Sequence, residues 1–232
     1  MVAGARRLLV ATALAAACAT GIDLAAKEDI DKRVRALGRP AQTFAASADP
    51  TPLPLAVGQW TQHELLDDQG RPSFLTMKLV GEDLGSYWLE LLEETYSGRR
   101  VTKLLVYFGD RSTPAALDIR AIKSRVGTGP VKEATQEELR ASRTDWAGVL
   151  SMLAVNWPGL PQEEARAPAG IFAGAYKRET EESWGPLLEK SLTWSHPAVP
   201  LSGLVRSQAS EGKGGLQLIA FGEKGAVTEL PE

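Results

Sequence analysis

The chain has 232 residues, of which 44% are hydrophobic and 24% are charged, and its formal net charge is −3. This many apolar residues can fill the core of a folded domain, which excludes a largely disordered chain. The slight acidic excess provides no basic field that would hold a phosphate backbone, so nucleic acid is not an expected partner.

The first residues have the plan of a secretory signal peptide. Arg6 and Arg7 precede an apolar stretch over residues 8–17, and Cys18 follows. A membrane-spanning helix needs about 20 apolar residues, and this stretch is too short to remain as an anchor. The sequence therefore predicts an exported protein from which residues 1–17 are removed.

Cys18 is the only cysteine of the chain and lies at the expected cleavage junction. Leu14 and the alanines at 15–17 resemble a bacterial lipobox, in which the cysteine is lipidated and becomes the new amino terminus. Ala19 stands where an aspartate would mark inner-membrane retention in lipoproteins. We therefore expect attachment to a membrane through lipidated Cys18, at the outer membrane facing the periplasm. The alternative is cleavage at the small-x-small site of residues 17–19, which would give a secreted or periplasmic protein.

Residues 18–56 differ in composition from the rest of the chain. Apolar residues spaced three and four apart predict a short helix over residues 22–37. Four prolines between residues 38 and 54 oppose both helix and central strand. We expect residues 18–56 to form a lipidated amino terminus, a short helix and a Pro/Ala-rich tether, with residues 57–232 as a single β-rich domain. The alternative is that this segment packs over the domain.

From residue 57 the pattern is that of a β-meander. Short runs with alternating apolar residues are separated by turn clusters rich in Gly, Asp and Pro. About ten strands are expected. They cover residues 57–66, 73–80, 85–96, 101–108, 117–126, 170–177, 187–195, 201–207, 214–221 and 227–230.

One segment has helical periodicity instead. Thr135 and Glu138 form a capping box, and apolar residues then recur at helical spacing. This predicts one amphipathic helix over residues 136–156 that covers a sheet face. The expected fold is mainly β (α+β), an antiparallel open or half β-barrel meander packed on one amphipathic helix. No strand-helix-strand alternation points to a parallel nucleotide-binding sheet.

The inventory of catalytic side chains is short. His63 lies beside an acidic turn and His196 follows a strand, and neither has a nucleophile or metal ligand at a suitable spacing. We expect both to be structural, and we expect no enzyme activity, no cofactor and no metal. The alternative is a hydrolase that uses His63 or His196.

Tryptophan is the conspicuous residue, with six in the chain. Large aromatic rings that line a concave sheet can hold an acyl chain. The candidate ligand-binding residues are Trp88, Trp146, Leu150, Leu153 and Trp194. The alternative is that these side chains fill the core between helix and sheet.

Three segments carry a resemblance to a known family: residues 87–90 with the following Gly98, residues 103–107, and residues 199–205. With the lipoprotein-like start, the chain resembles the lipoprotein-carrier superfamily. The resemblance implies a half-open β-barrel whose apolar concavity is closed by a helix, and a protein that binds an acyl chain, a lipid or a lipoprotein. The alternative is a structural or protein-interaction lipoprotein, which recognises an envelope protein and has no small ligand.

Overall fold

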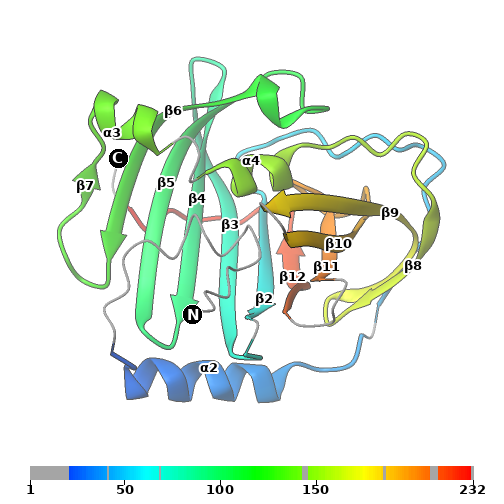
Figure 1. Ribbon diagram of the computed structural model, residues 1–232, viewed down its shortest axis with the longest axis horizontal. Helices are drawn as coiled ribbons and strands as arrows, with labels where there is room; N and C mark the ends of the chain where they lie inside the picture. Colours follow the sequence, from blue (N-terminus) through cyan, green and yellow to red (C-terminus); the bar gives the residue numbers. More distant parts are fainter. Residues whose placement is uncertain are drawn as a thin grey trace.

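The computed structural model describes residues 21–40, 42–67, 69–142, 146–184, 187–209 and 214–230, and shows a curved, largely antiparallel sheet (Figure 1). The strands are β1 (Thr43–Phe44), β2 (Trp60–Leu66), β3 (Pro72–Asp83), β4 (Ser86–Thr95), β5 (Gly98–Phe108), β6 (Leu117–Val126), β7 (Lys132–Glu133), β8 (Gln162–Ala167), β9 (Gly170–Trp184), β10 (Leu187–Ser195), β11 (Leu204–Ala209) and β12 (Gly215–Gly222). The helices are α2 (Leu24–Ala36), α3 (Gln136–Ala141) and α4 (Ala147–Leu153), with a 3₁₀ turn at Pro114–Ala116.

The sheet has 12 strands in the order β1-β9-β10-β11-β12-β2-β3-β4-β5-β6-β7, and β8 pairs with β9 beside this path. The pair β1 and β9 is parallel. The mainly β, antiparallel open-sheet fold predicted from the sequence is confirmed. The pattern missed β1 and β7, which have two residues each, and β8, which reads QEEARA and has only two alanines as apolar residues.

The strands β3 to β6 are covered by two helices on one face, which we call the inner face. On the inner face, Leu75, Leu89 and Leu104 are at most 1% exposed. Leu139 of α3 and Val149 of α4 belong to the same apolar cluster, so these two helices cover the inner face. The outer face carries the alternate side chains of the same strands, because neighbouring residues of a strand point to opposite sides.

The helix predicted over residues 136–156 is two short helices. Thr135 caps α3 with the expected capping box, in which the Glu138 amide donates to the threonine hydroxyl and the Glu138 carboxylate accepts from the Thr135 amide. The described chain resumes at Trp146, the N-cap of α4, and α4 ends at Leu153. The single long helix was therefore wrong, although its apolar residues do face the sheet.

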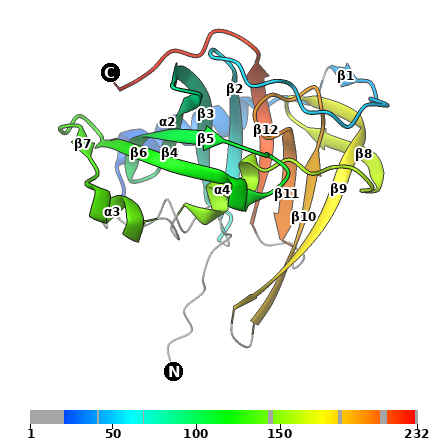
Figure 2. The same ribbon diagram turned by 90° about the horizontal axis from the view of Figure 1, so that it is seen from above.

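The strands β8 to β12 enclose a second apolar cluster. Figure 2 shows this part of the sheet turned away from β3–β6, with the β9–β10 hairpin extending furthest. Phe172 and Leu218 are fully buried in this cluster, with Trp194 8% exposed beside them. The Phe44 ring stacks on Phe172 with ring centroids 4.6 Å apart.

The segment before the domain packs against it. Ile30 of α2 is 2% exposed, and the Tyr96 hydroxyl donates to the Asp31 carboxylate at 2.6 Å. Phe44 of β1 reaches the second cluster, since β1 pairs with β9. The short helix predicted over residues 22–37 is present as α2, and both α2 and β1 contact the sheet. The reason is that Ile30 and Phe44 bury apolar area on surfaces that only the folded sheet provides.

The last described residues form a strap across the outer face. Here "C-terminal strap" means residues 223–230, which follow β12. Leu230 is fully buried and packs with Leu92 and Val101. The strand predicted over residues 227–230 was wrong, because the backbone amides of Glu229 and Leu230 donate to a side chain, the carboxylate of Glu90, and not to a neighbouring strand.

Candidate functional site

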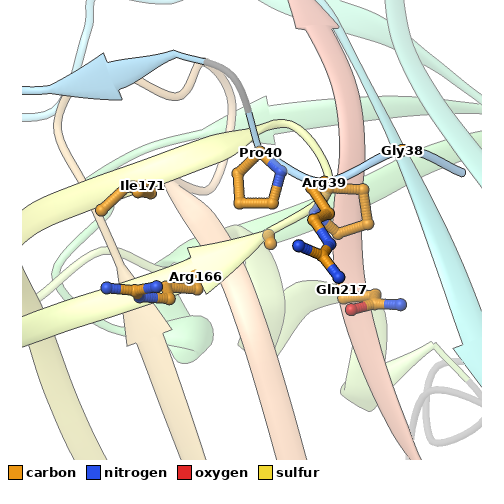
Figure 3. A pocket seen from close by; sticks show the side chains of 8 residues that line it. Gly38, Arg39, Pro40, Arg166, Ile171 and Gln217 are labelled. Atoms are coloured by element: carbon orange, nitrogen blue, oxygen red, sulfur yellow. The ribbon is translucent and has the colours of Figure 1, made fainter.

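A surface hollow of about 420 Å³ lies between the chain that follows α2 and the strands β8, β9 and β12. Figure 3 shows it from close by, with Arg39 extending from the overlying chain towards Gln217 and Arg166 on the other side of the hollow. Its lining residues are Gly38, Arg39, Pro40, Arg166, Ala167, Pro168, Ile171 and Gln217.

The local sequence places the overlying chain. The helix α2 ends at Ala36, and Leu37 is already extended, with φ −62° and ψ 116°. Pro40 cannot continue a helix and restricts the residue before it, so the chain runs on in extended form. The Gln42 carbonyl then accepts a hydrogen bond from the Ile171 amide at 2.8 Å, which ties this chain to β9.

The side chains of the hollow differ in how firmly they are held. The Arg166 Nε donates to the Glu164 carboxylate at 2.7 Å, and the Gln217 amide nitrogen donates to Glu64. Arg39 is exposed and makes no hydrogen bond or ion pair within the described ranges. It is therefore the group of this hollow that is available to an anion.

A second hollow of about 250 Å³ lies under the end of α2 itself. The Arg33 guanidinium lies over the Phe74 ring, 3.9 Å from its centroid, and one of its nitrogens is 2.9 Å from the Glu94 carboxylate. Gln217 of the first hollow and Ile219 of the second are two residues apart on β12, so both hollows flank the same stretch of chain.

That stretch is basic. We call residues 32–39 the basic segment: it contains Lys32, Arg33, Arg35 and Arg39 and no acidic residue. The basic segment was not among the predicted site residues, although four cations within eight residues of an acidic chain can be recognised from the sequence.

The structure does not bring the five predicted ligand-binding residues together. Trp146 and Leu153 belong to the inner-face cluster, 8% and 0% exposed, and Leu150 packs against that cluster. Trp194 lies in the second cluster, where its indole nitrogen donates to Glu163. Trp88 is separated from Trp146, Leu150 and Leu153 by the sheet itself, because it is on the outer face of β4.

Trp88 has cations for neighbours. The ammonium groups of Lys103 and Lys123 lie 5.3 and 5.6 Å from its ring centroid. These two lysines are directly opposite each other in the β5–β6 pairing, and Lys103 is also opposite Glu90 in β4. The indole therefore lies among charged side chains, an environment that suits a cation–π contact and not an acyl chain.

The two histidines bond to backbone carbonyls. The His63 ring Nε2 lies 3.1 Å from the Leu204 carbonyl, and complete burial lowers the pKa of His63 to about 4. The His196 Nε2 lies 3.1 Å from the Ala45 carbonyl, and its Nδ1 accepts from the Ala198 amide. Burial likewise lowers the pKa of His196.

No group of three or more His, Cys, Asp or Glu among the described residues could hold a metal ion. Within the same residues, none of the helices has the length and apolar character needed to cross a membrane. Cys18 and residues 1–17 lie outside the described residues, so the predictions for export and lipidation rest on the sequence.

Comparison with known proteins gives one weak structural likeness. No protein family matches the chain, and no curated protein matches its sequence. A solved structure from Bacteroides fragilis, provisionally described as an exported protein with a YmcC-like fold, has 11% sequence identity and a TM-score of 0.34, over 74% of this chain and 98% of that one. A likeness of this size carries no assignment, and the resemblance to the lipoprotein-carrier superfamily stays a prediction.

Proposed function

We propose that this chain is a non-catalytic lipoprotein of the bacterial cell envelope, anchored through Cys18, whose folded domain has a filled core and acts through its surface. The sequence around Cys18 supports the anchor. The observation that carries the mode of action is the packing of the inner face, where Trp146 is 8% exposed and Val149 and Leu153 are fully buried.

An acyl chain needs a continuous apolar cavity, and such cavities have volumes of several hundred Å³. Here the apolar space between α4 and the sheet is taken up by side chains of the protein itself. The two hollows described above lie elsewhere, on the side of α2, and are flanked by arginines. This arrangement favours the predicted structural or interaction role over the predicted lipid-binding role.

The histidine environments support a non-catalytic domain. A general base needs a ring nitrogen that can reach a substrate. The His63 ring is fully buried, and both nitrogens of His196 are engaged with backbone groups. We therefore expect the parent to show no hydrolase activity. A hydrolase activity that is present in the parent and lost in a folded variant with both histidines replaced by alanine would contradict this part of the proposal.

The anchor is tested by metabolic labelling with palmitate in a bacterial host. We expect the full chain to take up label and Cys18→Ser to take up none, because Cys18 supplies the only thiol. Ser47→Ala, a change of similar size in the segment that follows, is the control and should label like the parent. Label that persists in Cys18→Ser would show that the anchor is wrong.

The filled core is tested on the chain that begins at residue 18 and carries Cys18→Ser. The contacts described above lie between residues 23 and 230, so this chain retains them. Native mass spectrometry should show protein without bound lipid, and tryptophan fluorescence should not change on titration with palmitate. Stoichiometric lipid that is lost when the protein unfolds would contradict the proposal and restore the lipid-binding alternative.

A further inference from the structure

The basic segment contrasts with the rest of the molecule. The whole chain has a net charge of −3, yet residues 32–39 carry four cations and no anion. Two of these, Arg33 and Arg35, are in the last turn of α2, where cations offset the helix dipole. Arg39 lies beyond the helix end, so the dipole does not account for it.

Three of the four cations are available. Arg33 is engaged with Glu94 and with the Phe74 ring. Lys32, Arg35 and Arg39 are exposed, and none of them makes a hydrogen bond or ion pair with the residues that the structure describes. An ammonium and two guanidinium groups on one short stretch form a surface that attracts anions.

Two bulky apolar residues are exposed at the start of α2, on either side of its N-cap Asp23, and the exposed acids Glu28 and Asp29 follow them. Ile22 is 62% exposed and Leu24 is 78% exposed, which is unusual for residues of this size. A helix that presents bulky apolar residues at one end and cations at the other has the character of an element at a membrane interface.

The position of Cys18 in the sequence agrees with this orientation. Leu24 lies six positions after it. Because an extended chain spans at most about 3.6 Å per residue, a lipid on Cys18 would keep the start of α2 within roughly 20 Å of the bilayer. Electrostatic attraction to an anionic leaflet acts over about 10 Å at physiological salt, so the anchor brings the basic segment close to the distance at which the leaflet attracts it.

We propose that α2 and the basic segment are the membrane-facing surface of the domain, with Lys32, Arg35 and Arg39 contacting anionic phospholipid headgroups and Ile22 and Leu24 reaching the interface. The hollow beside Arg39, flanked by Arg166, provides room for one headgroup phosphate. The inference rests on the proposed function, because the anchor brings this surface to the membrane.

The inference also fixes the orientation of the domain. Figure 1 shows α2 at one end of the strands β3–β5 and α3 at the other end. With α2 on the membrane, α3 and β7 are directed away from it.

The test uses the chain from residue 18 with Cys18→Ser, so that no acyl anchor contributes. Its binding to phosphatidylcholine vesicles is compared, by flotation, with binding to vesicles that also contain phosphatidylglycerol. We expect binding only to the anionic vesicles, and we expect it to weaken as salt is added. The triple variant K32Q/R35Q/R39Q should bind roughly 100-fold more weakly, given the contribution of each cation near an anionic surface.

The matched control is K132Q/R140Q/K224Q. These three cations are also exposed, and they lie neither on α2 nor around the two hollows. The control loses the same total charge and should bind like the parent. Circular dichroism on all three proteins checks that the fold is kept. Equal binding of the parent and K32Q/R35Q/R39Q, or binding that does not need phosphatidylglycerol, would overturn the inference.

Inorganic phosphate separates a lipid surface from a soluble ligand. Added at constant ionic strength, it should not displace the parent from anionic vesicles, since one phosphate replaces only one of several contacts. Complete displacement would overturn the inference in favour of a soluble anion site at Arg39. Palmitate labelling tests the anchor separately. Labelling can fail while vesicle binding remains, which would contradict only the anchor, and vesicle binding can fail while labelling remains, which would contradict only the membrane-facing surface.

Discussion

The carboxylate of Glu90 accepts a hydrogen bond from the hydroxyl of Thr228 at 2.8 Å, which joins the middle of β4 to the C-terminal strap. The same carboxylate accepts from the amides of Glu229 at 2.9 Å and Leu230 at 3.2 Å. Glu90 is fully buried, and its charge is balanced by Lys78, whose ammonium lies 3.4 Å away. One buried carboxylate therefore holds the end of the chain across the outer face.

Replacing this carboxylate should destabilise the protein. Glu90→Gln keeps the shape but removes the charge, which leaves Lys78 with only the more exposed Glu229 as an acidic partner and weakens the hydrogen bonds to the strap. We expect a loss of about 3 kcal/mol in the free energy of unfolding, as for other broken buried pairs, measured by urea denaturation at neutral pH.

Thr228→Val is the graded control for this prediction. It removes one hydroxyl from the carboxylate and leaves the two amide donors, so a loss of about 1 kcal/mol is expected. Hydrogen exchange should show faster opening of residues 228–230 in both variants. Unchanged exchange in Glu90→Gln would show that the carboxylate does not hold the strap.

His63 should make stability depend on pH. Its pKa falls from 6.5 to about 4 on folding, because burial disfavours the charged ring. Between these two pKa values the unfolded chain binds a proton that the folded chain excludes. The contribution of His63 to the free energy of unfolding is therefore complete above pH 6.5 and is lost as the pH falls towards 4. The shift corresponds to about 3 kcal/mol between those limits.

The measurement is the free energy of unfolding of the parent and of His63→Gln at several pH values from 4 to 7. Glutamine can donate to the Leu204 carbonyl but does not titrate. The parent should lose stability relative to the variant as the pH is lowered. Parallel pH profiles for the two proteins would rule out the proposed role of burial.

Phe44 tests whether the amino-terminal segment is part of the folded domain. Its ring stacks on Phe172 and lies 5.4 Å from the Phe221 ring. Phe44→Ala should cost about 2–3 kcal/mol in thermal or urea unfolding, because it removes a half-buried ring from the second cluster. Leu24→Ala, at a position that is 78% exposed, should change stability by less than about 0.5 kcal/mol. A free tether would make both variants neutral.

Leu153 tests the filled inner face. It is fully buried against the sheet, so Leu153→Ala should leave a cavity and cost about 2–5 kcal/mol. Leu150→Ala should cost less, because Leu150 is only partly buried. If Leu153 lined an open cleft, Leu153→Ala would be nearly neutral, and urea denaturation distinguishes these outcomes.

Alternation in the sequence was enough to predict most of the sheet. In β4, for example, Leu89 and Leu91 face one side and Trp88 and Glu90 the other, as the period of two requires. The capping box at Thr135 was equally local and is confirmed. The break between α3 and α4 was not predicted, because Leu139 and Leu153 fit one helical stripe whether or not the helix continues.

The site was less predictable than the fold. Trp88 and Trp146 are both aromatic residues of the same domain, and nothing in their spacing says that a sheet separates them. The role of Glu90 was hidden for the same reason, since its partners Thr228 and Glu229 are far away in the chain. The sequence shows that Arg39 is charged, but it does not show the hollow beside it, because that hollow is lined by residues of β8, β9 and β12.

The sequence by itself determined the local features of this protein: the strand periodicity, the helix start at Thr135, and the signal-like start that ends at Cys18. These depend on residues a few positions apart, whose side chains interact in any fold. Only the tertiary structure decided what Phe44 packs against, which groups Glu90 binds, and which surface Arg39 lies on. Burial, pairing and the shape of a surface depend on residues brought together from distant parts of the chain, and periodicity within a segment contains no information about them.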